Sequence, residues 1–279
     1  MNFKFLNLIV YQKQQLNSLV GLCGGYELNE WRYKQFAEWL FDYHLLDFAL
    51  KYSEYKDIDF TTAAKKLRTA ARIIFQTENP RRGEFGELLL HGVIKEAFNT
   101  TPAITKIYFK DGPNETVKGF DAVHVVANDN NLELWLGEVK FYNDFHTAVS
   151  HVVTEIQDHL QKDYLRNEFL AINNKLDNTF PHYEKLRKLL DTNTSLDQIF
   201  DAICIPVLLT YDSTIVKKHN KLSEQYTTEL REELIAYDLH FWKKLGSCQV
   251  KVHLFLVPLE DKAKLFETLL EKLKLWQNI

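Results

Sequence analysis

The sequence predicts an α/β protein in which helices flank a mixed central sheet, preceded by a helical N-terminal region. Two observations lead to this prediction. From residue 83 onward, the apolar patterns follow the order helix, three strands, helix and strand. Residues 202–209 and 252–259 are apolar without alternation, which is typical of strands that are buried on both faces.

The first third of the chain predicts helices. In residues 30–50, apolar side chains recur at steps of three and four, which gives one apolar face, and residues 61–75 show the same pattern. Pro80 then disfavours helical geometry at the residue before it. We therefore divide the chain into a mainly helical region, residues 1–80, that offers a partner contact, and an α/β domain, residues 81–279.

The apolar pattern of the α/β domain predicts a succession of helices and strands. Its predicted helices and strands are a helix at 83–98, strands at 104–110, 116–127 and 132–141, a helix at 144–166, a strand at 202–211, a helix at 224–245, a strand at 249–257 and a helix at 260–276. Residues 111–114 form a turn signal, and the polar residues 128–131 suit the loop of a hairpin.

The composition indicates an ordinary globular protein but does not indicate its function. The 279 residues are 46% hydrophobic and 26% charged, as in ordinary globular proteins. A net charge of −4 argues against a protein that coats nucleic acid indiscriminately, but it is compatible with a local basic rim on a nuclease. Three distant cysteines lack metal-ligand spacing and favour a reducing cytosol. With no apolar run of membrane-spanning length, we expect a cytoplasmic protein.

A short acidic-x-lysine pattern occurs three times, and one copy differs in its surroundings. Residues 54–56 and 260–262 are polar and are most simply solvated charges. The third copy, Glu138-Val-Lys140, lies inside the apolar strand 132–141. Taken alone, this copy is best explained as a surface salt bridge at a strand end.

The hairpin register changes that interpretation. If residues 128–131 form the loop, the two apolar stripes match and Asp121 falls directly opposite Glu138, with Gly119 opposite Lys140. The pairs that fix this register are Ala127 with Leu132, Val125 with Leu134 and Val123 with Leu136. The proposal fails if Asp121 and Glu138 point to opposite faces of the sheet.

Two carboxylates at the end of an apolar face repel and desolvate each other. A divalent cation between Asp121 and Glu138 would remove both penalties, and Mg²⁺ favours carboxylates together with water and phosphate. Lys140 would orient or deprotonate the attacking water, or stabilise charge on the phosphate. Gly119 would leave room for a substrate backbone.

The helix at 83–98 carries acids in its first turn. Glu84 and Glu87 are favourable there simply because they face a helix N-terminus. Their functional interpretation is a further metal ligand. Gly83 and Gly86 support it, because glycine is costly in a helix unless something approaches closely.

These motifs resemble a known group of enzymes. Gly-Glu-Phe-Gly-Glu87, Gly-Phe-Asp121 and Gly-Glu138-Val-Lys140 resemble the PD-(D/E)xK nuclease superfamily, although Gly-Phe-Asp replaces Pro-Asp. The whole chain is similar to the HamA family of nuclease subunits from the Hachiman antiphage defence system. The resemblance implies a PD-(D/E)xK-like sheet, Mg²⁺ or Mn²⁺ bound by Asp121, Glu138 and Glu87, and Lys140 as the catalytic lysine. It also implies DNA cleavage with little sequence specificity, restrained by a partner helicase.

The chain has no Walker A motif, so any ATP-driven step would belong to another chain.

Two alternatives to a DNA nuclease stay open at this point. A catalytically silent nuclease fold could serve as a binding or regulatory module of a helicase complex. RNA could replace DNA as the substrate, although no recognisable RNA-binding module supports this.

Overall fold

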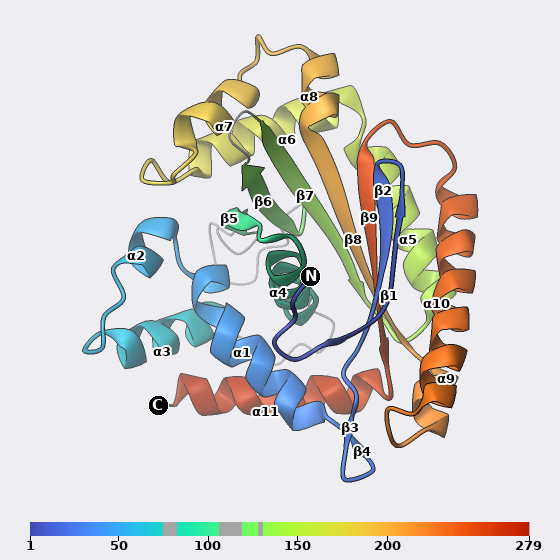
Figure 1. Ribbon diagram of the computed structural model, residues 1–279. Helices are drawn as coiled ribbons and strands as arrows, with labels where there is room; N and C mark the ends of the chain where they lie inside the picture. The colour runs from blue at the N-terminus through green and yellow to red at the C-terminus, as the bar shows by residue number, and fades with distance from the viewer. Residues whose placement is uncertain (75–82, 106–118, 128–130, 279) are drawn as a thin grey trace.

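The computed structural model describes residues 1–74, 83–105, 119–127 and 131–278. Within them, seven strands form one mixed sheet in the order β1-β2-β9-β8-β7-β6-β5, and β3 and β4 form a separate hairpin (Figure 1). The strands are β1 (Asn7–Gln14), β2 (Asn17–Cys23), β3 (Tyr26–Glu27), β4 (Glu30–Trp31), β5 (Thr101–Thr105), β6 (Ala122–Ala127), β7 (Leu132–Phe141), β8 (Ile203–Asp212) and β9 (Lys251–Leu259).

Helices cover both faces of this sheet. Helix α4 packs on β6 and β7, and α1 packs on α4 and α11 on the same side, whereas α5 and α10 lie on the opposite side (Figure 1). The helices are α1 (Tyr33–Ala49), α2 (Tyr52–Lys56), α3 (Ala63–Ile74), α4 (Glu84–Phe98), α5 (Phe145–His159), α6 (Lys162–Lys175), α7 (Tyr183–Leu189), α8 (Leu196–Ala202), α9 (Thr214–Lys218), α10 (Glu224–Leu245) and α11 (Lys262–Gln277). None of these helices, in the part of the chain that is described, is long and apolar enough to cross a membrane.

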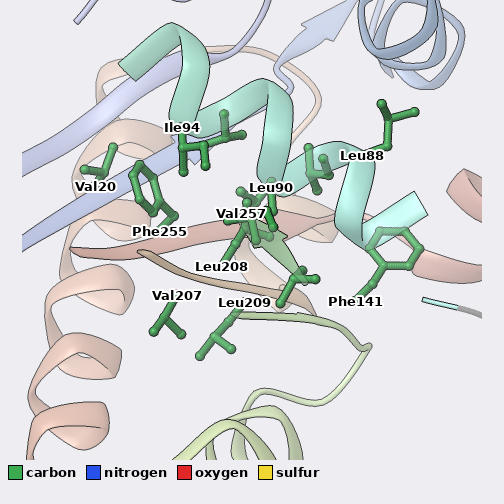
Figure 2. Packing of buried hydrophobic residues seen from close by; sticks show 14 of the residues in the cluster. Val20, Leu88, Leu90, Ile94, Phe141, Val207, Leu208, Leu209, Phe255 and Val257 are labelled. Carbon is green, nitrogen blue, oxygen red and sulfur yellow. The ribbon is translucent and has the colours of Figure 1, made fainter. Parts of the chain in front are cut away.

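The parallel centre of the sheet forms the core. Strands β2, β9, β8 and β7 pair in parallel, and β8 and β9 are buried along nearly their whole length. Figure 2 shows Leu90 and Ile94 of α4 among the buried side chains of β8 and β9. The prediction that the two continuous apolar runs are doubly covered strands is confirmed.

The predicted hairpin register is also confirmed. Val123 pairs with Leu136, Val125 with Leu134, and Ala127 with Leu132, all in antiparallel orientation. This register follows from one constraint, because a slip by one residue would turn the apolar stripe of β6 away from the core.

The first residues of the chain differ from the prediction. The expectation of a mainly helical region is wrong for residues 7–23, which form β1 and β2 of the central sheet. The buried run in β2 is stabilised by pairing with β9, a contact more than 200 positions away that local periodicity does not reveal. The boundary expected near residue 80 lies outside the described residues.

Two further boundaries shift. The single helix expected at 144–166 is divided into α5 and α6, because Leu160 ends the first helix and Gln161 is extended. The apolar pattern runs through this break without a glycine or proline to mark it. The strand expected at 104–110 begins at Thr101 and is described only to Thr105, so its predicted turn at 111–114 lies outside the described residues.

A buried polar network ties the N-terminal helices to the sheet. His91 of α4 contacts Asp47 of α1 through Nε2 (3.2 Å) and His124 of β6 through Nδ1 (3.1 Å). His124 in turn bonds Thr100 (2.7 Å), and Lys95 pairs with Asp47. Residues from both sides of the expected boundary therefore share one network.

We predict that Asp47→Ala lowers the free energy of unfolding at pH 7 by about 3–5 kcal/mol, because it leaves the partners of a buried carboxylate uncompensated. Urea denaturation measures this loss. Glu38→Ala, at an exposed position on the same helix, is the control and should change stability by less than about 0.5 kcal/mol. A loss at Asp47 no larger than that at Glu38 would contradict the prediction.

The same carboxylate predicts a pH dependence. Burial raises the pKa of Asp47, but His91 and Lys95 more than offset this and hold the pKa well below its ordinary value of 3.8. A depressed carboxyl pKa contributes stability above the unfolded value and loses it as the pH falls. The stability gap between wild type and Asp47→Ala should therefore be constant at neutral pH and shrink below about pH 4. A gap independent of pH down to acid unfolding would argue against it.

Candidate active site

The end of the β6–β7 hairpin holds three of the predicted residues. Asp121 lies directly before β6, and its N–H donates to the Gly137 carbonyl (2.8 Å). The β6–β7 ladder begins one residue later, where Ala122 pairs with Gly137, and the Asp121 carboxylate reaches the backbone of β7 at Val139, the residue after Glu138. Lys140 follows on the same face of β7. The hairpin brings together three ionisable side chains that are buried from water. The exposed fraction is 6% for Asp121, 1% for Glu138 and 8% for Lys140.

Asp121 is fixed by the backbone of the facing strand. Its Oδ2 accepts a hydrogen bond from the Val139 N–H at 2.8 Å. The charge of Asp121 acts on both Glu138 and Lys140. The two carboxylates therefore belong to one electrostatic site, as the register predicts.

Glu138 is the most deeply buried member. Burial raises its pKa to about 7, and the charge of Asp121 adds to this effect, whereas His159 and Lys140 lower it. His159 Nδ1 lies 2.5 Å from Glu138 Oε1. Across the sheet on its other side, Glu138 neighbours the fully buried Val207 of β8. The position strongly favours added positive charge.

Lys140 carries its charge at neutral pH. Burial lowers its pKa, but Asp121, Glu155 and Glu138 outweigh the burial and leave the pKa above 10.5. Its ammonium forms an ion pair with Glu155 of α5. A lysine held in this way is a fixed cation beside the two carboxylates.

Helix α5 supplies partners to the two candidate site residues of β7. Glu155 pairs with Lys140 and His159 with Glu138. The match is geometric, because four helical residues rise about 6 Å and two strand residues about 6.7 Å. Glu155 and His159 are not among the residues predicted for the site, although two titratable residues four apart beside the apolar stripe of this helix were a usable signal.

The space expected beside Gly119 is occupied. A Cβ at this position would lie 2.7 Å from Oε1 of Glu168, a buried acid of α6. Gly119 also has a φ of +138°, which side chains rarely adopt. The glycine thus accommodates a further carboxylate instead of leaving an open channel for substrate, and Glu168 is another residue that the sequence analysis missed.

Glu84 and Glu87 lie in the first turn of α4 and are both buried. Helix α4 approaches β7 through Gly86, where a Cβ would meet Phe141 at 2.9 Å and Val139 at 3.3 Å. The close approach expected at Gly86 is therefore that of the strand, from the face that alternates with Glu138 and Lys140. Among the described residues, no three His, Cys, Asp or Glu side chains have metal-binding spacing. A metal-binding role for Glu87 stays a prediction.

A separate cavity of about 220 Å³ lies between α1, α2, α4 and β5. Its walls include Asp47, Tyr52, Lys95 and Thr100, and none of the predicted site residues. We therefore locate the candidate chemistry at the hairpin and not in this cavity.

We predict that Gly119→Ala destabilises the fold by about 1–3 kcal/mol, because the substitution combines backbone strain with a clash against Glu168. Gly246→Ala is the matched control: its φ is +73°, but a Cβ there meets nothing within 4 Å. Chemical denaturation should show a smaller loss at Gly246. Adding Glu168→Ala should recover part of the loss at Gly119 alone, and equal losses at the two glycines would refute the clash.

Comparison with known proteins shows a match to one family over nearly the whole chain. The family model of HamA matches residues 2–273. A protein of Escherichia coli (strain K12) named anti-bacteriophage protein A is 24% identical over 264 residues, which covers 89% of this chain and 46% of that relative. The chain thus spans less than half the length of this relative.

Proposed function

The chain belongs to the HamA family, and from this premise we propose that it is a metal-dependent deoxyribonuclease of antiphage defence. One observation carries the proposal: at the end of the β6–β7 hairpin the buried Asp121 carboxylate is bound to the Val139 N–H, between the buried side chains of Glu138 and Lys140 in the sequence of β7. The name of the Escherichia coli relative, anti-bacteriophage protein A, supports the defence role.

The acids fit a hard divalent cation. Mg²⁺ and Mn²⁺ accept carboxylate oxygens together with water and phosphate oxygens, so they do not require a full protein cage. Burial and the charge of Asp121 raise the pKa of Glu138, which means that they disfavour its ionised form. A cation bound here would stabilise that ionised form. We assign Asp121 and Glu138 as its ligands, and Glu87 is a third candidate on the family resemblance alone, because α4 approaches β7 from the face that alternates with Glu138. The bound cation would activate water and polarise the scissile phosphate.

Lys140 has a narrower role than the sequence alone suggests. Because its pKa is raised, it is protonated at neutral pH and is a poor proton acceptor. We propose that it stabilises the charge that develops on the phosphate as the bond breaks. Val139 contributes through its backbone, which holds Asp121 in place.

Substrate and partner follow from the family resemblance. We propose cytoplasmic DNA as the substrate, cut with little sequence specificity, and a helicase as the partner that restrains cleavage. Without a Walker A motif, this chain leaves ATP hydrolysis to that partner. A net charge of −4 suits an enzyme whose DNA binding depends on its complex more than on its own surface.

We predict that Glu138→Ala and Lys140→Ala each reduce cleavage of plasmid DNA at least about 100-fold, because the first removes a ligand of the cation and the second removes the ammonium that stabilises charge on the phosphate. Initial rates with Mg²⁺, measured with the partner present, test this. The matched control is Glu54→Ala with Lys56→Ala, the same triplet spacing on the exposed helix α2, which should cleave like wild type. Full activity in either site variant would show that the site is wrongly assigned.

Metal removal separates the enzyme from a silent nuclease fold. Chelation with EDTA should abolish cleavage of plasmid, linear and single-stranded DNA, and excess Mg²⁺ or Mn²⁺ should restore it. The alternative, a regulatory subunit of a helicase complex, predicts a stable complex without metal-dependent cleavage under any condition. Cleavage by this chain that persists in EDTA would contradict the metal-dependent mechanism.

A further inference from the structure

His159 is held between two aromatic rings beside the candidate site. The Tyr164 ring of α6 stacks on it, with centroids 4.3 Å apart and an interplanar angle of 14°. Phe120 meets it edge-on at 5.0 Å and 70°. Phe120 directly precedes Asp121, so the ring clamp is built from the same segment as the site.

The clamped ring contacts one atom of the carboxylate. His159 Nδ1 lies 2.5 Å from Oε1 of Glu138, and the Glu138 side chain is 1% exposed. An ionised Glu138 accepts this hydrogen bond, with Nδ1–H as the donor. Oε2 is then the Glu138 oxygen that is left to meet a cation, and the ring fixes the rotation of the carboxylate.

We propose that His159 is a positioning residue for Glu138: it orients this carboxylate for the divalent cation and stays in place when the cation binds. This inference rests on the proposed function. Acids that bind metals commonly take a second hydrogen bond that fixes their orientation, and losing that partner typically costs about 10–100-fold in metal affinity.

Two other roles for His159 fit the contacts less well. As a lock that must open, the ring would have to leave both Phe120 and Tyr164 before a cation could bind. As a purely structural partner, it would affect stability but not the affinity for metal. The aromatic clamp favours a residue that keeps its position in both states.

The experiment measures Mn²⁺ binding by the full chain without DNA, from the electron paramagnetic resonance signal of free Mn²⁺. His159→Phe fills the space between the two rings but cannot donate, and we expect about 10–100-fold weaker binding. His159→Asn places an amide N–H near the position of Nδ1 and should keep the affinity close to wild type. His151→Phe, at an exposed position on the same helix, is the matched control and should bind like wild type.

The outcomes separate this inference from the proposal on which it rests. Wild-type affinity in His159→Phe, or tighter binding, overturns the positioning role alone, provided that Asp121→Asn weakens Mn²⁺ binding. Failure of the wild type to bind Mn²⁺, or no effect of Asp121→Asn, overturns the metal site and this inference with it. Thermal unfolding of each variant checks the fold, and failure of His159→Asn to rescue also counts against the proposal.

Discussion

Two acidic side chains lie at the buried end of an antiparallel hairpin, and several neighbouring groups compensate their negative charge. Glu138 has Asp121 on one side and the apolar Val207 on the other, so water cannot screen it. Positive or donating groups must come from elsewhere in the fold, and they do: Lys140 from the same strand, His159 from α5 and the Val139 amide from the backbone. An uncompensated pair of carboxylates here would cost several kcal/mol.

The two faces of β7 divide the work between packing and chemistry. On one face, Gly86 and Leu90 of α4 press against the strand so closely that glycine is used at 86 and 137. On the other face, α5 brings Glu155 and His159 at a spacing that matches Lys140 and Glu138. The rigid apolar face holds the strand still, and this rigidity is what allows the polar face to fix side chains within a narrow range of positions.

The N-terminal segment is integral to this arrangement. Strand β2 extends the parallel centre of the sheet, and Asp47 of α1 is joined through His91 to His124 on β6, three residues after Asp121. Burying such a network requires every member to be satisfied, so α1, α4 and β6 keep one relative placement. The strand that begins directly after Asp121 is thus connected by this network to helix α1.

The sequence by itself determined the features that depend on local pattern. The bounds of β7 and the hairpin register from Ala122 to Ala127 follow from alternation and loop length, since one apolar face must point to the core. Tertiary structure decided the rest. Strand β2 owes its conformation to β9, and His159 meets Glu138 only because α5 packs on β7 and ends at His159. Contacts between elements distant in sequence leave no periodicity behind, so only the folded chain shows which partners a buried charge receives.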